Sequence, residues 1–495
     1  MKEEWSELIR ERIRKGEDIR RGGGNPYAND QKVGWTAAAA RKAAGGLDPG
    51  ELAARGIRVD IAGRIVASRN FGKATFVVIA DRSGSLQAYI RKDQVGEEAY
   101  DRFLKTTDVG DIAWVRGPLF ITRTGELTVQ AESFRLLTKT VRPLPEKWHG
   151  LVDVETRYRQ RYVDLIVNEE VKEVFRRRAR IISHIRSFLT DRDFLEVETP
   201  MMQPVAGGAA AKPFVTHHNA LDMDLYLRIA PELYLKRLLV GGFERVFEIN
   251  RNFRNEGIST QHNPEFTMLE FYQAYADYED LIRLTEEMIS GLALSLLGTT
   301  VVTIQGETVD FAPPWERVTV AGAVARYGNV PEERLAEVPF LREMARGLGF
   351  SVKDDASRGR LLVAIFEEVA ERKIRGPAFV TEYPIEVSPL SRRNDLRPEI
   401  VDRFELIVLG REIANAFSEL NDPLDQRSRF EEQIRLRERG DEEAHCMDED
   451  YLRALEHGMP PAAGEGIGID RLVMLFTDSP SIRDVILFPQ LRKEG

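Results

Sequence analysis

Cysteine is nearly missing from this chain. Cys446 is the single cysteine among 495 residues, which excludes an intramolecular disulfide and any cysteine-cluster metal site. Seven histidines are scattered without the spacing of metal ligands. No apolar run approaches the length of a membrane span, and no signal peptide opens the chain. We therefore expect a cytoplasmic protein without a membrane partner, in a reducing compartment.

An excess of basic residues is also missing. The formal net charge is −10 at pH 7, whereas most nucleic-acid-binding domains carry a basic surface. RNA contacts would have to come from local patches such as Arg176–Arg178. A solvated helix face or a subunit contact also explains that run, and we favour this interpretation.

The length suggests two or three domains. Segments 58–68, 73–81, 84–91, 112–121 and 127–137 have strand patterns, and 95–106 has a helix pattern, which together predict a five-stranded OB-fold β-barrel. From residue 169 helices alternate with antiparallel hairpins, so the fold class is α+β. The expected parts are an N-terminal helical or irregular extension (1–56), the barrel (57–140), a linker (141–168) and a large domain (169–495) with an insertion at about 300–370.

The segment 251–273 carries the richest chemistry. Residues 265–273 are predicted to form a strand whose alternation places Phe266, Glu270 and Tyr272 on one face. Arg254 approaches from the preceding loop. A base could stack on the aromatic ring, a phosphate could pair with the arginine, and an ammonium could lie beside the carboxylate. Taken alone, this segment is equally consistent with a half-buried strand that carries ordinary surface charges.

A second segment, 464–474, has glycine at three alternate positions followed by Arg471 at a predicted helix start. Glycine lets a backbone approach a ligand closely, and a phosphate could meet both the arginine and the helix N–H groups. A tight strand-to-helix turn would also explain the glycines. The pattern matches neither a P-loop nor a dinucleotide-binding fingerprint.

A third segment, 404–419, is predicted to form a hairpin that turns near residues 409–410. Glu405 and Glu412 flank the turn and could hold a divalent cation between phosphates. Alternation places Asn415, Phe417 and Glu419 on one face. It places Glu412 on the opposite face, so either a β-bulge intervenes or Glu412 lies outside the site. A surface hairpin with two solvated acids is the alternative.

Together these segments resemble motifs 2 and 3 of the class II aminoacyl-tRNA synthetases, and specifically the lysyl-tRNA synthetase family. Residues 188–200 resemble motif 1, and 207–214, 228–237 and 388–395 look like the lysine enzymes rather than their aspartate or asparagine relatives. The resemblance runs from about residue 57 to about residue 492. Ala414, Ala416 and Glu465 depart from the usual pattern, which affects the fine shape of the pocket and not the reaction.

The resemblance implies an AMP-forming lysine–tRNA ligase. Such an enzyme uses ATP and Mg²⁺ to activate L-lysine as lysyl-adenylate and transfers the lysyl group to the 3′ end of tRNA(Lys). It implies a catalytic domain built on an antiparallel sheet flanked by helices, a barrel that binds the anticodon, and a homodimer formed through motif 1.

The resemblance also assigns residues to roles. Arg254 and Arg471 are the expected catalytic residues, on the α- and γ-phosphates. The expected ATP-binding residues are Arg254, Glu256, His262, Asn263, Phe266, Glu405 and Arg471. Glu405 and Glu412 are the expected Mg²⁺ ligands. The expected lysine-binding residues are Gly208, Glu232, Glu270, Tyr272, Asn415, Phe417 and Glu419. The expected anticodon-binding residues are Arg69, Phe76, Gln87 and Glu132.

Several of these residues have simpler interpretations. Glu232 follows Pro231 and would favour the dipole at a helix N-terminus in any case. Phe76 could be a core residue of the barrel. Two other functions also remain open. An enzyme that lysylates another acceptor usually lacks the barrel, and a non-catalytic relative tends to lose the arginines and acids of the ATP site.

Overall fold

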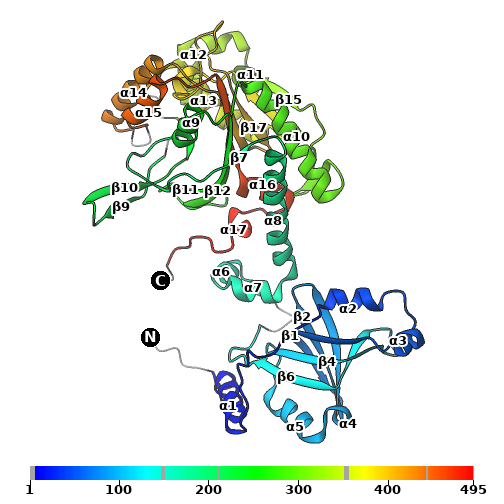
Figure 1. Cartoon of the computed structure of the whole chain (residues 1–495). Helices are drawn as coiled ribbons and strands as arrows, with labels where there is room; N and C mark the ends of the chain where they lie inside the picture. Colours follow the sequence, from blue (N-terminus) through cyan, green and yellow to red (C-terminus); the bar gives the residue numbers. More distant parts are fainter. Residues whose placement is uncertain (1–5, 146–150, 210, 351–355, 442–443, 494–495) are drawn as a thin grey trace. The chain divides into compact units, whose positions relative to one another are not determined.

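The computed structural model describes residues 6–145, 151–209, 211–350, 356–441 and 444–493. The chain divides into two compact units, Met1–Val152 and Asp153–Gly495 (Figure 1). The α+β class predicted from the sequence is confirmed. Within the described ranges, no helix combines the length and apolar character that crossing a membrane requires.

The first unit contains a β-barrel. Its strands are β1 (Arg58–Asn70), β2 (Ala74–Asp81), β3 (Gly84–Arg91), β4 (Ile112–Ile121), β5 (Leu127–Ala131) and β6 (Ser133–Thr138). They pair in the order β1-β2-β3-β5-β4-β6, and a further β1–β4 pairing closes the barrel. The predicted fifth strand is interrupted at Glu132 and therefore forms two strands, β5 and β6. At the interruption the Glu132 N–H donates to the Arg116 carbonyl.

Helices cover this barrel. They are α1 (Glu7–Arg21), α2 (Ala37–Ala44), α3 (Pro49–Arg55), α4 (Lys92–Val95) and α5 (Glu97–Thr106). The alanine-rich stretch near residue 40, where the sequence shows no periodicity, forms α2, and its Ala37 and Ala40 join the barrel core. Thr36 and Asp48 cap α2 and α3 by accepting backbone N–H groups, which explains where these short helices begin.

The second unit is built on an eight-stranded sheet in the order β15-β16-β17-β18-β19-β12-β11-β7. Its strands are β7 (Leu195–Glu196), β11 (Arg245–Phe253), β12 (Glu265–Ala274), β15 (Glu316–Thr319), β16 (Ala378–Thr381), β17 (Arg403–Val408), β18 (Arg411–Ser418) and β19 (Ala462–Gly468). The pairs β15–β16 and β11–β7 are parallel, and the other pairs are antiparallel.

One face of this sheet carries the main core. The helices α8 (Glu169–Thr190), α10 (Tyr278–Leu297) and α16 (Ile469–Phe476) pack there against inward side chains such as Leu269 and Phe271. The helix α9 (Glu232–Val240) packs against β11 and β12, and α15 (Glu449–Glu456) packs between α9 and α14 (Pro423–Glu438). The short α17 (Ile482–Val485) packs against α16 and α8. Alternation leaves the opposite face of β12 to line the candidate site.

The second unit also contains two smaller sheets and a separate group of helices with its own core. The sheets are β8-β10-β9, with β8 (Met202–Gln203), β9 (Val215–His218) and β10 (Met223–Leu227), and β13 (Val301–Ile304) with β14 (Glu307–Asp310). The range 300–370, which has little pattern in the sequence, also contains α11 (Val320–Gly328), α12 (Val338–Gly347) and α13 (Arg358–Val369). These three helices share a core of their own with β15 and β16.

Part of the expected linker is helical and firmly held. Within 141–168 lie α6 (Val154–Arg159) and α7 (Arg161–Val167). Arg161 is buried, and its guanidinium bonds Asp164 at 2.6 Å, the Arg483 carbonyl at 2.8 Å and the Leu487 carbonyl at 3.1 Å. A buried guanidinium is stable only when its donors are satisfied, so this clamp joins the start of the second unit to its C-terminal segment.

Candidate active site

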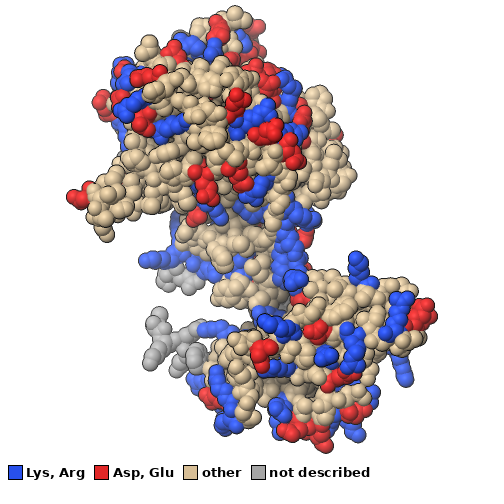
Figure 2. All heavy atoms as spheres, viewed as in Figure 1, with Lys and Arg blue, Asp and Glu red and all other residues tan. Residues whose placement is uncertain are grey.

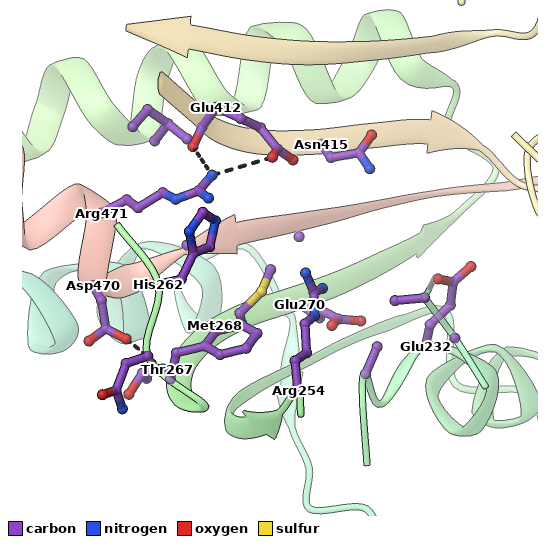
Figure 3. A pocket seen from close by; sticks show the side chains of 18 of the residues that line it. Glu232, Arg254, His262, Thr267, Met268, Glu270, Glu412, Asn415, Asp470 and Arg471 are labelled. Atoms are coloured by element: carbon purple, nitrogen blue, oxygen red, sulfur yellow. Dashed lines mark hydrogen bonds and ion pairs between the residues drawn. The ribbon is translucent and has the colours of Figure 1, made fainter. Parts of the chain in front are cut away.

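The candidate site is a cavity on the face of the sheet opposite the main core. Its floor comes from β12, β18 and β19, and the loop that follows β11 overhangs it. Figure 3 shows Arg471, His262 and Glu412 gathered at one end and Glu232 at the other, with Arg254 and Glu270 between them. The cavity therefore joins a cationic end to an acidic end.

β12 supplies the aromatic and acidic side chains, as predicted from its alternation. Phe266, Glu270 and Tyr272 all line the cavity. Arg254 lies over the Phe266 ring, with its guanidinium carbon 5.1 Å from the ring centroid. Its buried Nε has no hydrogen-bond partner among the described residues. An unpaired guanidinium edge above an aromatic ring is suited to bind an anion attached to a flat base.

β19 and α16 bring the glycines and Arg471 together. Gly464, Gly466 and Gly468 line the cavity, and α16 begins two residues before Arg471. A Cβ on Gly464 would lie 2.3 Å from Tyr272 Cε1 and 2.4 Å from Glu419 Oε1. No side chain fits there, so this glycine is required by close contact and not by turn geometry.

The hairpin of β17 and β18 contains a bulge that decides the position of Glu412. Leu406 pairs with Ala414 while Ile407 pairs with Glu412, so Ile413 is the extra residue. The bulge brings Glu412 and Asn415 to the same cavity (Figure 3). This is the first of the two arrangements that the sequence allows.

Arg471 and Glu412 hold each other at the cationic end. Arg471 Nη1 donates to the Glu412 backbone carbonyl at 2.6 Å and lies 3.3 Å from its Oε2, the contacts dashed in Figure 3. His262 is close by, and burial, then the charge of Arg471, lower its pKa. The imidazole thus lies between the guanidinium groups of Arg471 and Arg254, which can pair with phosphates, and the carboxylates of Glu256 and Glu412.

Two other residues expected around the nucleotide differ in what they contact. Glu256 lines the cavity at its rim. Asn263 also lines it, but its amide donates to the Glu265 carbonyl at 2.6 Å and accepts the Gln490 N–H at 3.3 Å. Its side chain therefore shapes the loop in this structure.

Glu405 and Glu412 line a neighbouring hollow that opens into the same cavity through Glu412 and Arg254. Burial raises the pKa of Glu405 to about 7, while Arg403 lowers it and Glu412 raises it. Among the described residues, no group of three or more metal-ligating side chains gathers in one place. Two carboxylates fit Mg²⁺ only where phosphate and water oxygens complete the shell, which suits a nucleotide-bound ion.

The acidic end is strongly buried. Glu232 and Glu270 line the cavity beside Gly208, whose φ of 87° is accessible to glycine. Burial raises the pKa of Glu270 to about 8, and the charge of Glu232 adds to this. Tyr272 OH donates to Glu270 Oε2 at 3.3 Å. The carboxylates repel one another when ionised, so an ammonium that binds between them would be stabilised by both.

Glu419 stands apart from the other expected lysine contacts. Asn415 and Phe417 line the cavity, whereas Glu419 is 1% exposed and lies next to Gly464 and Tyr272 at its edge. Its carboxylate forms an ion pair with Lys236, which also contacts Glu232. Sequence reasoning missed Lys236, although the four-residue spacing from Glu232 on a predicted helix places both on one face.

A second missed group supports Arg471 from behind. Asp470 accepts from Arg178 Nη1 at 2.5 Å and from the Thr267 N–H at 2.7 Å. Arg178 belongs to a basic run whose other members, Arg176 and Arg177, form surface ion pairs along α8, the region where Figure 2 shows basic side chains gathered. The run was interpreted as a solvated face, and this holds except for Arg178.

On the first unit, Arg69, Phe76 and Gln87 share the outer face of the barrel. Arg69 pairs with Phe76 across β1 and β2, and Gln87 pairs with Val78, two residues further on. Phe76 stacks on Tyr89 at 4.3 Å, while the core contains its neighbours in sequence. The alternative that Phe76 is a core residue is wrong. Glu132, where the last strand breaks, forms an ion pair with Arg58.

Comparisons with known proteins agree with this geometry. Residues 153–492 match the family model of tRNA synthetases class II (D, K and N), and residues 59–137 match that of the OB-fold nucleic acid binding domain. The lysine–tRNA ligase of Magnetococcus marinus is 56% identical over all of this chain and 98% of its own length. That of Thioalkalivibrio sulfidiphilus is 61% identical over 89% of this chain and 88% of its own length.

A third relative, the lysine–tRNA ligase of Pelotomaculum thermopropionicum, is 61% identical over 88% of this chain and 86% of its own length. The barrel, the sheet and the cavity thus coincide with the regions that the family models match. The chain therefore belongs to the class II tRNA synthetases of the D, K and N group.

Proposed function

We propose that this chain is a lysine–tRNA ligase. The observation that carries the proposal is a single cavity with guanidinium groups at one end and buried carboxylates at the other. ATP fits the cationic end and the ammonium groups of L-lysine fit the acidic end. The lysine carboxylate attacks the α-phosphorus of ATP, pyrophosphate leaves, and lysyl-adenylate then acylates the 3′ end of tRNA(Lys), releasing AMP.

The substrates supply the reacting groups, so the protein contributes position and charge. Arg254 is placed to pair with the α-phosphate and the substrate carboxylate, with adenine stacked on Phe266. Arg471 is placed for the γ-phosphate and must then leave Glu412. Both guanidinium groups neutralise negative charge that develops at phosphorus and on the leaving pyrophosphate.

The donor set at Glu405 and Glu412 fits Mg²⁺. These two carboxylates would hold the ion from the protein side, and the ion would neutralise phosphate charge. Glu412 pairs with the Arg471 guanidinium, and Mg²⁺ would take the place of that positive charge.

The acidic end selects the amino acid. An acidic substrate would meet Glu232, Glu270 and Glu419, whose charge Lys236 balances only in part, and this repulsion costs far more than a missing methylene. Glu419 and Tyr272 are the proposed partners of the ε-ammonium. Glu232, Glu270 and the backbone at Gly208 are the proposed partners of the α-amino group.

The barrel is proposed to bind the anticodon of the tRNA. Phe76 and Tyr89 form a stacked aromatic surface flanked by Arg69 and Gln87, which is the chemistry that single-stranded bases need. We further propose a cytoplasmic homodimer, on the resemblance of 188–200 to motif 1. Size-exclusion chromatography coupled to light scattering measures the molecular mass in solution. The mass of a monomer would contradict the proposed dimer.

The deciding experiment is ATP–pyrophosphate exchange with each common amino acid. We expect exchange with lysine to exceed exchange with any other by at least about 100-fold. Charging of tRNA(Lys) transcripts is the second arm. Lysine-dependent exchange without charging would point to another lysyl acceptor, and exchange with a different amino acid would overturn the proposal.

A further inference from the structure

Lys236 is a buried cation that the proposed reaction does not use. Its side chain is 0% exposed, and its Nζ lies 2.5 Å from Glu232 Oε1 and forms an ion pair with Glu419 Oε2. The Phe417 ring centroid is 5.2 Å away. Burial opposes the charged form, but Glu232 and Glu419 outweigh it and raise the pKa of Lys236. The ammonium is therefore charged and shared by two carboxylates.

The contact with Lys236 occupies only one side of Glu419. Its Oε2 faces the ammonium, whereas its Oε1 lies next to Gly464, a residue that lines the cavity. Apart from the ion pair, neither oxygen accepts a hydrogen bond from any residue that the structure describes. Lys236 thus holds Glu419 through one oxygen, and the other oxygen lies beside Gly464 and Tyr272, which both line the cavity.

The charges at the acidic end then balance those of a diamino acid. Glu232, Glu270 and Glu419 carry three negative charges when ionised, and Lys236 removes one. Two remain, and lysine brings two ammonium groups. The substrate carboxylate is neutralised separately, at Arg254, so the internal cation makes up the difference between three acids and two amines.

We infer that Lys236 is a positioning residue for amino-acid recognition, which holds Glu232 and Glu419 in place and leaves the acidic end with two net negative charges for a substrate with two ammonium groups. This inference rests on the proposed function and names how the same site matches its substrate. Lys236 touches neither the cavity nor a reacting atom, so it acts through the two carboxylates.

Loss of Lys236 would leave three carboxylates repelling one another in a buried space. Burial already raises the pKa of Glu419 to about 8, and Lys236 opposes that rise. Without it the carboxylates bind protons at higher pH and present fewer charges to lysine. The titratable and charged groups that surround Lys236 and the three carboxylates are Arg228, Glu232, Glu248, Glu270, Tyr272, Arg403, Glu419, His445 and Tyr451.

The test compares Lys236→Met with Arg237→Met. Both remove one positive charge from α9, but Arg237 pairs with Asp448 outside the acidic end. Lysine-dependent ATP–pyrophosphate exchange between pH 6 and 9 gives KM for lysine and for ATP. For Lys236→Met we expect at least a tenfold rise in KM for lysine at pH 7, an ATP KM within twofold, and an acid limb of 1/KM displaced to higher pH. Arg237→Met should leave all three unchanged.

A double variant keeps the test decisive if Lys236→Met does not fold. Glu232→Gln with Lys236→Met removes one charge of each sign and leaves two net negative charges. The acid limb should then stay at its wild-type position even though KM for lysine rises through the lost Glu232 contact. A limb displaced in the double variant would overturn the inference.

Two other results would also overturn it. The first is an unchanged KM for lysine in Lys236→Met. The second is an equal rise of KM for lysine and for ATP while the acid limb keeps its wild-type position. That second result would make Lys236 a packing residue. Wild-type enzyme without lysine-dependent exchange would instead overturn the proposed function, so the two failures are distinct.

Discussion

Arg254 is the residue on which the proposed chemistry depends most. Its guanidinium lies over Phe266 with an unpaired Nε. Arg254→Ala should lower the rate of lysine-dependent pyrophosphate exchange by at least about 100-fold, because a preorganised charge at the phosphorus is lost. Arg251→Ala is the matched control, since Arg251 forms only a 3.7 Å surface contact with Glu265. A mild effect of Arg254→Ala would remove it from the transition state.

Glu465 makes stability depend on pH. It is buried on the core side of β19, where Thr285 donates to it, and burial raises its pKa from 4.5 to about 8. The folded state therefore holds a proton that the unfolded state releases, so this contribution to stability is full below about pH 4.5 and is lost as the pH rises toward 8.

Glu465→Gln should remove that dependence. The gain in melting temperature over the wild type should be small at pH 5 and grow toward pH 8, since each pH unit in this window costs the wild type up to about 1.4 kcal/mol. Thermal melts at both pH values measure it. Glu287→Gln, an exposed acid on α10, is the control. An equal difference at both pH values would mean that Glu465 is ionised in the folded protein.

Sequence patterns located the residues whose side chains alternate along a strand. Phe266, Glu270 and Tyr272 follow from β12 alone. The burial of Glu419 and its partnership with Lys236 could not be predicted, because they depend on how α9 packs against the end of β18. A pattern of neighbouring residues does not show which elements pack together in space.

At the scale of elements, the glycines of β19 leave room above the sheet for the side chains that face the lysine-binding end. A Cβ on Gly464 would lie within 2.4 Å of Glu419 Oε1 and closer still to Tyr272. Gly464→Ala should therefore displace both side chains and raise KM for lysine by at least about tenfold, with little change in KM for ATP.

Gly466→Ala on the same strand is the control for Gly464→Ala. Its Cβ would meet the flexible end of Met268 at 3.1 Å, which can move. Pyrophosphate exchange at varied lysine and ATP gives both constants. If the two variants behave alike, the close contact at Gly464 does not govern the lysine-binding end.

Element boundaries were predicted unevenly. The range of α8 follows from its sequence, 169–190. The bulge at Ile413 is one of two arrangements that the sequence allows. Alternation shows that Glu412 is out of register with Asn415, but it does not show whether a bulge corrects the register or Glu412 lies outside the site. The helices α2 and α3 were missed, since an alanine-rich stretch has no contrast between buried and exposed positions.

At the scale of the whole molecule, we expect the two units to have separable tasks. Phe76→Ala on the barrel should lower tRNA charging by at least about tenfold, because a stacked base is worth about 1–3 kcal/mol. It should leave lysine-dependent pyrophosphate exchange unchanged. Arg102→Ala, on the exposed side of α5, is the control. An equal loss of both activities would indicate a folding defect and not a lost tRNA contact.

The boundary between the two units, after Val152, lies inside the linker that the sequence predicts at 141–168. That linker is partly helical, which the sequence does not indicate. Arg161 gave no signal in the sequence, because a buried arginine bonded to carbonyls looks like any arginine of a charged segment. The partners that justify its burial are more than 300 residues away along the chain.

This Arg161 clamp makes the molecule sensitive to truncation from one end. A fragment that starts at Asp153 keeps the arginine and the carbonyls that receive it, so cutting away the barrel spares the clamp. Proteolysis that passes residue 483 from the carboxyl terminus instead removes the Leu487 and Arg483 carbonyls and leaves the buried guanidinium with Asp164 alone among these partners. Carboxypeptidase trimming should thus destroy amino-acid activation well before it reaches the strands of the sheet.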